Sequence, residues 1–395
     1  MAEPYSILHF NEGYGRDKYL SSEGNRRVAQ YLREQGVEPV VVRGNEGWDI
    51  TSGLVVPNRI ITTIEGDSTH VVTEPFDGPI EYGATSIRDY SYVPVGEEVE
   101  ASGANVINPL EIRRLDEKNL AFELLGDLQP LTVVVEPDKF IQQLGDIKTD
   151  EVVLKPVQSE DSHGLLMASK ADLLNPEKYR LERREDGIHL LGETNPPVDI
   201  HLDRKKGYLL QETINTRAPF PAGIHVIDSC MADYQANIHN PKEVRLMLYW
   251  DQTRADKQIV VPYARTFTPH GHNEVRDRTT HSDNWLLLDI EKGLPQDLDG
   301  LTQDVAARIL KVGDTRYFHG AFDVAFDGHR WYMMELNMWF PTPPSYKLAR
   351  EKGAERLADI HRQSIADLMA DTAKDAHGAK NTENTQVGRR LHLDT

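Results

Sequence analysis

The chain of 395 residues has a single cysteine, Cys230, which excludes an internal disulfide bond. It has no apolar run near the roughly 18 residues that a membrane-spanning helix needs. The first residues, MAEPYSILHF, lack the basic start and apolar core of a secretory signal. A cytoplasmic protein without a membrane partner is therefore expected, since reduced thiols are the rule in that compartment.

Positive charge is also scarce, because 44 basic residues face 63 acidic ones and the net charge is −19. A general nucleic-acid-binding protein would need a basic face, so that class of partner is not expected. There is no internal repeat, and no convincing Ser-His-Asp or Cys-His set that would indicate a protein nucleophile. The length and the 39% hydrophobic content instead fit a globular enzyme of two or three domains.

Residues 1–108 have the pattern of a modest α/β domain. An apolar strand at Tyr5–Phe10 precedes a helical pattern over Asn25–Gly36 and a buried-type strand at Val37–Val42. This order predicts parallel strands joined by a right-handed crossover. Further short strands are predicted at Gly53–Val56, Arg59–Thr63 and His70–Thr73. The loop NEGYG between the first strand and helix lacks the full glycine pattern of a dinucleotide site.

The middle of the chain contains two lysines in distinctive settings. Asn108-Pro109 indicates a boundary, and Pro109–Gly126 is predicted to be one amphipathic helix that carries Lys118. Lys155 ends the apolar strand Glu151–Pro156, where an unpaired cation is costly and a phosphate would be a suitable partner. Both lysines also have ordinary interpretations, as a solvated helix residue and as a lysine that reaches to the surface.

The second half contains two arginines inside apolar strands. Glu243–Trp250 carries Arg245 and Ile259–Phe267 carries Arg265, and a guanidinium in such a place either meets an anionic ligand or pairs with an acid. An apolar strand is predicted at Gly207–Asn215, and only a loop and a short strand over Arg217–Asn240. Helices are predicted at Thr302–Val312 and Ala354–Ala373, followed by a disordered tail from Lys374. The loop Thr268–Asn284, with three histidines, is expected to cover a site, and a metal site there is the lesser alternative.

A β-hairpin is predicted near the C-terminus, where two apolar runs flank Asp327-Gly328. The first run, His319–Gly328, carries Asp323, and the second, which begins at Trp331, delivers Glu335 and Asn337. Paired strands would bring these oxygen donors together, and such donors suit Mg²⁺. A hairpin with solvated or capped acids is the alternative that the residues alone leave open.

Taken in order, these segments resemble the ATP-grasp superfamily, of the carboxylate–amine ligase type that includes D-alanine–D-alanine ligase and glutathione synthetase-like enzymes. The resemblance spans about residues 109–345 and rests on LDEK, VVLKP, the polar loop VQSEDSHG, YLLQETI, EVRLML and the hairpin acids. It implies an α/β (α+β) fold with an N-terminal domain (1–108), a linker part (109–150), a lid (151–206), a C-terminal metal-binding subdomain (207–373) and the tail (374–395). The acids Glu160 and Asp161 depart from the more glycine-rich family loop.

The resemblance also implies a role for each matching residue. ATP would be bound by Lys118, Lys155, Ser159, Ser162, His163, Gly164 and the hinge residues Gln211, Glu212, Thr213 and Ile214, with Glu243 at the ribose. Arg245 and Arg265 would be the catalytic residues. Asp323, Glu335 and Asn337 would hold one or two Mg²⁺ ions, or Mn²⁺.

The implied reaction is ATP-dependent amide or peptide bond formation through an acylphosphate, by a C–N ligase acting on a small carboxylate and an amine. Two alternatives stay open, namely a kinase that phosphorylates a small-molecule hydroxyl and an ATP-binding protein without catalysis. A homodimer is left open as well. Nothing in the sequence identifies the substrates.

Overall fold

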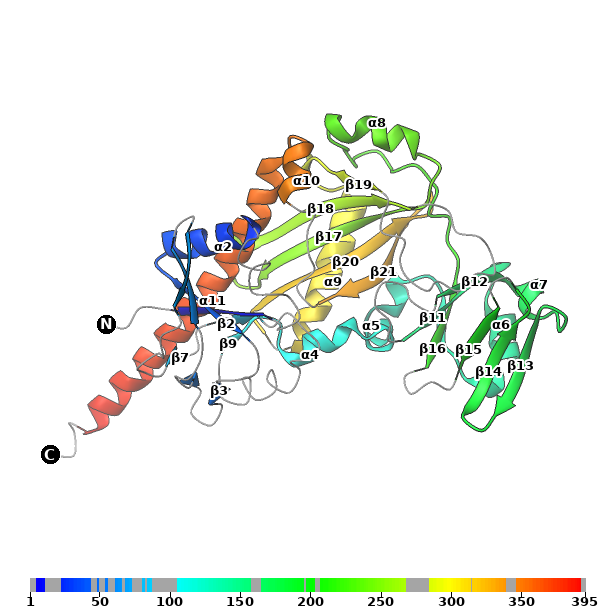
Figure 1. The fold of residues 1–395 in the computed structure, drawn as a ribbon, viewed down its shortest axis with the longest axis horizontal. Helices are drawn as coiled ribbons and strands as arrows, with labels where there is room; N and C mark the ends of the chain where they lie inside the picture. Colours follow the sequence, from blue (N-terminus) through cyan, green and yellow to red (C-terminus); the bar gives the residue numbers. More distant parts are fainter. Residues whose placement is uncertain are drawn as a thin grey trace.

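The computed structural model describes residues 5–10, 23–43, 48–49, 54–55, 61–65, 68–72, 80–81, 84–86, 105–157, 165–194, 197–202, 207–267, 284–313, 315–338 and 346–391. Figure 1 shows three parts in a row, with the N-terminal sheet at one end, a large sheet in the centre and a small subdomain at the other end. No helix of these residues is long and apolar enough to cross a membrane.

The N-terminal part is built on a sheet in the order β6-β5-β2-β1-β8-β9. Its elements are β1 (Tyr5–Phe10), α2 (Glu23–Glu34), β2 (Glu38–Arg43), β5 (Ile61–Glu65), β6 (Ser68–Val72), β8 (Ala84–Ser86) and β9 (Asn105–Val106). The strands β3 (Trp48–Asp49), β4 (Leu54–Val55) and β7 (Ile80–Glu81) form a separate small sheet. β1 and β2 pair in parallel, as the strand–helix–strand pattern predicts.

The small subdomain, residues 129–212, has its own apolar core around Phe140, Leu144 and Leu210. One sheet has the order β10-β16-β11-β12, and a second has the order β13-β14-β15. The elements are β10 (Thr132–Val134), α6 (Phe140–Asp146), β11 (Glu151–Pro156), β12 (Leu166–Ser169), α7 (Lys170–Leu173), β13 (Tyr179–Arg184), β14 (Gly187–Gly192), β15 (Val198–His201) and β16 (Tyr208–Glu212). The first sheet thus joins strands from three predicted parts of the chain, namely the linker part (109–150), the lid (151–206) and the C-terminal subdomain (207–373).

The central sheet is antiparallel, in the order β19-β18-β17-β20-β21. Its strands are β17 (Lys242–Asp251), β18 (Gln258–Thr266), β19 (Asn284–Leu287), β20 (Tyr317–Phe326) and β21 (Trp331–Asn337). Helices α9 (Gln296–Gly313) and α11 (Glu355–Leu391) pack against it, and α11 also lies along α2 of the N-terminal part (Figure 1). Long apolar strands such as Tyr317–Phe326 are buried along almost their whole length, so this sheet is the rigid centre of the fold.

The predicted helix over Pro109–Gly126 is wrong as a single element. It is broken into α4 (Leu110–Arg113), a 3₁₀ turn (Arg114–Asp116) and α5 (Lys118–Leu125). Glu117 takes extended backbone angles between them, with ψ of 117°. The side chain of Asp116 accepts a hydrogen bond from the backbone N–H of Met338 just after β21, which draws this turn to the central sheet.

Two further predictions need correction. The segment Arg217–Asn240 contains a helix, α8 (Asp228–Ala236), which the sequence hides because Cys230 and Tyr234 are its only buried residues. The tail beyond Lys374 is helical as far as Leu391, because α11 continues there without a break. Extending a helix that is already formed fixes one residue per hydrogen bond, so a polar stretch can follow a packed one. The short helix α10 (Tyr346–Glu351) precedes α11.

Asn108 joins the boundary segment to the central hairpin. Its side-chain amide donates to the carbonyls of His319, at 2.5 Å, and Met338, at 2.7 Å, and its Oδ1 accepts from the His319 N–H at 2.8 Å. The residue is fully buried and has a positive φ of 60°, which asparagine tolerates better than most side chains. This contact anchors the segment that leads into α4 and α5 to the strand ends.

Candidate nucleotide and cation site

The site is organised by a β-bulge in the hairpin of β20 and β21. Asp323 lies opposite Glu335, but the register shifts between Asp323 and Val324, where Met334 is the extra residue. Burial along β21 shows the same shift, because Met333 and Leu336 are buried while Met334 and Glu335 between them are not. The bulge therefore directs Glu335 to the face of Asp323, as bulges beside functional sites often do for a side chain. The prediction that the hairpin brings these two acids together is confirmed.

Asp323 is held by two arginines from neighbouring strands. Arg245 forms a bidentate pair with it, Nε to Oδ1 and NH2 to Oδ2, both at 2.7 Å. Arg265 donates to the same Oδ2 at 2.9 Å and also contacts Glu243, the residue opposite it on β17. Each buried guanidinium thus meets an anion, as predicted, and that anion is an acid of the chain itself.

The two arginines keep the Asp323 carboxylate charged although it is buried. Burial alone would raise the pKa of Asp323, but Arg245 and Arg265 outweigh it and lower the pKa below its usual value. Burial would likewise lower the pKa of Arg245, and Asp323 together with the more distant Glu335 raises it. Two fixed positive charges and the Asp323 carboxylate therefore form the floor of the site, with one arginine hydrogen bond to Oδ1 and two to Oδ2.

Lys118 lies at the first residue of α5 and meets the hairpin. Its Nζ is 3.1 Å from Glu335 Oε1, with 13% of the lysine side chain and 39% of the glutamate side chain exposed. Its backbone N–H also donates to the carbonyl of Val157 at the end of β11, at 3.3 Å. Lys118 is therefore not a solvated surface lysine, because its ammonium meets the hairpin and its backbone meets the small subdomain. Its helix, α5, lies between those two parts (Figure 1).

Lys155 is buried near the end of β11, with 8% of its surface exposed. Its Nζ donates to Gln211 Oε1 at 3.0 Å, and Gln211 in turn donates to Thr132 Oγ1 at 2.7 Å. No carboxylate of the described residues lies within ion-pairing distance of this ammonium. Burial, with a smaller contribution from nearby Lys118, lowers the pKa of Lys155 to about 8, and Glu335 partly opposes the shift. The Lys155 ammonium is thus a second positive charge, buried from solvent and close to Lys118.

The oxygen donors fit a hard divalent cation at two of the three predicted positions. Glu335 has a partly exposed carboxylate, and Asn337 lies on the same strand face, its amide nitrogen 3.4 Å from Asp323 Oδ2. Both can present oxygen to an ion that keeps most of its water and phosphate ligands. Asp323 is already hydrogen-bonded to both arginines, so its predicted role as a direct ligand has the least support from the geometry.

The other predicted nucleotide contacts divide into three groups. Gln211 is buried and accepts from the Lys155 ammonium. Glu212 accepts from the Lys148 N–H and Thr213 donates to the Glu151 carbonyl, so these contacts fix the end of β16. Ile214 follows it, and Glu243 pairs with Arg265. Ser159, Ser162, His163 and Gly164, like the histidines of loop 268–283, lie outside the described residues.

Three residues that support the site carry no functional signal in the sequence. Thr132 orients Gln211, Asp116 holds the end of β21, and Asn108 holds both ends of the hairpin base. Of these three, only Asn108 belongs to a sequence signal, the Asn-Pro boundary. The neighbouring sequence does not indicate the distant carbonyls that Asn108 contacts. Such residues act through contacts more than 70 positions away along the chain.

Comparison with known proteins was made by sequence and by structure. No family model and no curated protein matches the sequence. Among solved structures, the VanG D-Ala:D-Ser ligase from Enterococcus faecalis is similar over 94% of this chain and 100% of its own, with a TM-score of 0.52 and 10% identity. A D-cycloserine synthetase is similar over 92% and 99%, with a TM-score of 0.50 and 14% identity.

The chain has an ATP-grasp fold. The predicted fold class is thereby confirmed, with mixed helices and antiparallel sheets arranged as in these ligases. At such low identity the likeness extends to the fold alone. Lys118, Lys155 and Glu335 lie together where the small subdomain meets the central sheet.

Proposed function

We propose that this ATP-grasp protein is an ATP-dependent carboxylate–amine ligase. A substrate carboxylate would attack the γ-phosphorus of ATP and release ADP, and an amine would then displace phosphate from the acylphosphate to leave an amide. The observation that carries the proposal is Lys155, a buried ammonium with no carboxylate partner among the described residues, placed beside Lys118 and the Glu335 carboxylate. A triphosphate with a divalent cation complements this arrangement of charges.

Each group then has a defined task. Lys118 and Lys155, which come from α5 and β11, would bind phosphate oxygens side by side. Glu335 and Asn337 would hold Mg²⁺, which when bound neutralises charge on the transferred phosphoryl group. Arg265, with Arg245 behind it, fixes Asp323 and keeps a permanent positive charge at the floor. The small subdomain would keep water from the reactive acylphosphate.

The proposal is tested by screening amino acids and dipeptides, singly and in pairs, for phosphate release from ATP. A ligase should release phosphate only when carboxylate and amine are both present, at least tenfold above either alone, with an amide detected by mass spectrometry. ADP formation with a single hydroxyl compound, without free phosphate, would show a kinase. No nucleotide turnover with any pair, together with no ATP binding, would refute the proposal.

Arg265→Ala should lower kcat about 100-fold and change the KM for ATP less than about threefold, because a fixed cation near the reacting phosphoryl group stabilises developing charge more than bound ATP. Steady-state kinetics would be compared with Arg254→Ala, which removes an exposed, ion-paired arginine in the connection between β17 and β18. A folded Arg265→Ala protein that keeps its kcat and loses only ATP affinity would place Arg265 on the nucleotide instead.

A further inference from the structure

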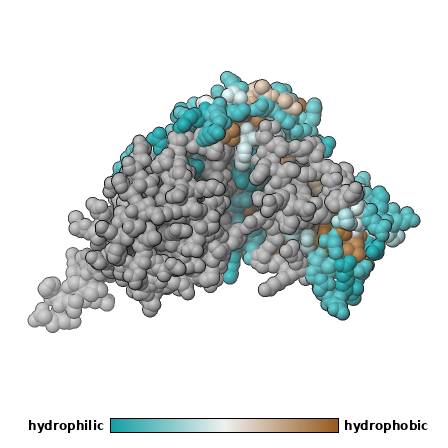
Figure 2. Space-filling model, viewed as in Figure 1, coloured by the Kyte–Doolittle hydropathy of each residue, from teal (hydrophilic) through white to brown (hydrophobic). Residues whose placement is uncertain are grey.

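A second cluster of polar groups lies on the three-stranded sheet of the small subdomain, away from the nucleotide junction. His189 on β14 and His201 on β15 are directly paired in register, so both point to the same face. Asp199 lies on that face two residues before His201, and Asp186 lies in the tight turn from β13 to β14. Figure 2 shows a largely hydrophilic surface over this end of the molecule, with one small hydrophobic area.

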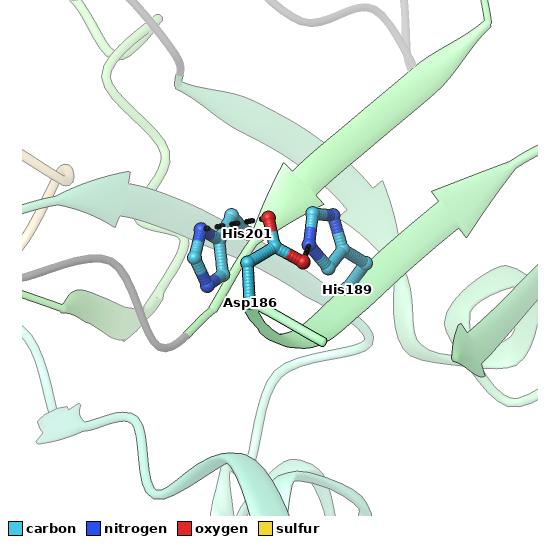
Figure 3. A group of neighbouring side chains, drawn as sticks. All are labelled: Asp186, His189 and His201. Atoms are coloured by element: carbon cyan, nitrogen blue, oxygen red, sulfur yellow. Dashed lines mark hydrogen bonds and ion pairs between the residues drawn. The ribbon is translucent and has the colours of Figure 1, made fainter. Parts of the chain in front are cut away.

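The Asp186 carboxylate faces a nitrogen of each imidazole (Figure 3). Its Oδ1 is 3.1 Å from His189 Nε2, and its Oδ2 is 4.0 Å from His201 Nδ1. The two rings are nearly parallel, at 7°, with their centroids 4.6 Å apart. One ligand atom from each of the three residues can be chosen so that all lie within 4.8 Å of one another.

Both ring nitrogens of His189 face carboxylates. Nδ1 lies 2.7 Å from Asp199 Oδ1, while the other oxygen of Asp199 accepts from Arg184 at 3.0 Å. A carboxylate behind one nitrogen fixes the ring and leaves the other nitrogen as a lone-pair donor, which is the usual arrangement around metal-bound histidines. His201 has a buried Nε2 with no hydrogen-bond partner among the described residues.

These spacings are close to those around a tetrahedral ion. Ligand atoms about 2.1 Å from such an ion lie about 3.4 Å from each other. The separations of 3.1 and 4.0 Å, which involve the two different oxygens of Asp186, lie on either side of that value. A small rotation of Asp186, or binding through both of its oxygens, would complete the contacts. Two imidazoles and a carboxylate favour zinc-class metals over Mg²⁺, which prefers oxygen donors alone.

We propose that Asp186, His189 and His201 bind a divalent transition-metal ion of the zinc class, with Asp199 positioning His189. The ion would join the β13–β14 turn to β15 and so brace the three strands of this sheet. This site is independent of the proposed ATP reaction, because it shares no residue with the nucleotide junction.

The test is equilibrium dialysis of the full chain against ZnCl₂, with metal analysis, and visible absorption after Co²⁺ substitution. One ion per chain should bind, and Co²⁺ should give an intense tetrahedral spectrum. His201→Ala should abolish binding, His189→Ala should weaken it at least tenfold, and Asp199→Asn should weaken it roughly 10- to 100-fold by loss of the positioning carboxylate. His201 is partly exposed, so its variant should fold, which circular dichroism would check.

Two control variants show where the ion binds. His270→Ala/His272→Ala removes two of the three loop histidines, and Glu335→Gln alters the proposed Mg²⁺ position, so both should bind Zn²⁺ like the unaltered chain. Unchanged Zn²⁺ binding in folded His201→Ala, or loss of binding in the loop variant, would overturn the assignment. Absence of Zn²⁺ binding at micromolar concentrations would mean that the cluster binds a proton only, which also overturns it.

Discussion

Glu335→Gln should give a folded protein whose ATP-dependent turnover is lower by on the order of 1,000-fold, or about 4 kcal/mol of transition-state stabilisation. Glutamine keeps the size of the side chain and one oxygen, so packing of β21 against its neighbours is unaffected. It removes a partly exposed carboxylate that pairs with Lys118 and not with an arginine. The loss should therefore be in cation binding and in charge neutralisation on the phosphates.

The variant also changes the balance around the lysines. Glu335 raises the pKa of Lys155, opposing burial, so its loss moves that pKa further down. The ammonium then carries less charge at neutral pH, which weakens phosphate binding further. The weaker cation binding and the reduced charge on Lys155 both lower turnover. We therefore expect substitution of Glu335 to reduce turnover more than substitution of Asn337.

Turnover would be measured by phosphate release over a range of Mg²⁺ concentrations, after circular dichroism has shown that the variant is folded. The Mg²⁺ requirement should rise at least tenfold. Glu123→Gln, an exposed acid on α5, is the matched control and should behave like the unaltered enzyme. A folded Glu335→Gln protein with turnover within threefold of normal would contradict the proposed cation site.

Lys155→Met should have two opposite effects, a loss of at least 100-fold in ATP affinity and a gain in stability of about 1–2 kcal/mol at pH 7. The folded protein keeps this ammonium in a dry position, at a cost that its depressed pKa of about 8 measures. Methionine removes the cost, although it leaves the Gln211 amide oxygen without its donor. If Lys155 served only the fold, its replacement would lower the stability of the protein instead of raising it.

The gain should depend on pH in a defined way. The folded-state pKa of Lys155, about 8, lies below the value of 10.5 for a free lysine, so between these values the unfolded chain binds more protons. The unaltered protein therefore gains stability as pH rises from 8 towards 10.5. The advantage of Lys155→Met is fully present below pH 8 and should shrink across that window.

Lys242→Met is an unusually close control. Lys242 is also buried, and burial also lowers its pKa to about 8, but its Nζ donates to the carbonyls of Arg217, Ile238 and Asn240. Its removal should destabilise the protein by about 2 kcal/mol, because three carbonyls lose their donor. Urea unfolding at pH 7 and pH 9 and nucleotide titration would measure these effects. Equal destabilisation in both variants would show Lys155 to be structural.

Much of the fold could be predicted because long apolar strands carry their own signal. Glu151–Pro156 has the bounds that the sequence indicates, and the strands bearing Arg245 and Arg265 differ from expectation by only one or two residues. The partners of those arginines could not be predicted. A guanidinium in a strand indicates an anion nearby, but only the order of β17, β18 and β20 shows that the anion is Asp323.

The orientation of Glu335 was predicted correctly for an incomplete reason. Simple alternation along Trp331–Asn337 would place Glu335 on the same face as buried Trp331, pointing into the core. The bulge at Met334 reverses this, and no residue in the stretch signals it. Likewise, the break between α4 and α5 depends on Asp116 reaching a backbone N–H 222 positions away.

The extra residue in β21 has a consequence for insertions and deletions. If Met333 or Met334 were deleted, the ladder could close without the bulge, and Glu335 would still lie opposite Asp323 with a methionine facing the core. An insertion before Glu335 has no such buffer, because the strand already carries one residue more than its partner. Chains with this site could thus lose a residue ahead of the glutamate and keep the same geometry. Sequence alignments that penalise that gap heavily would misplace the acid by one position.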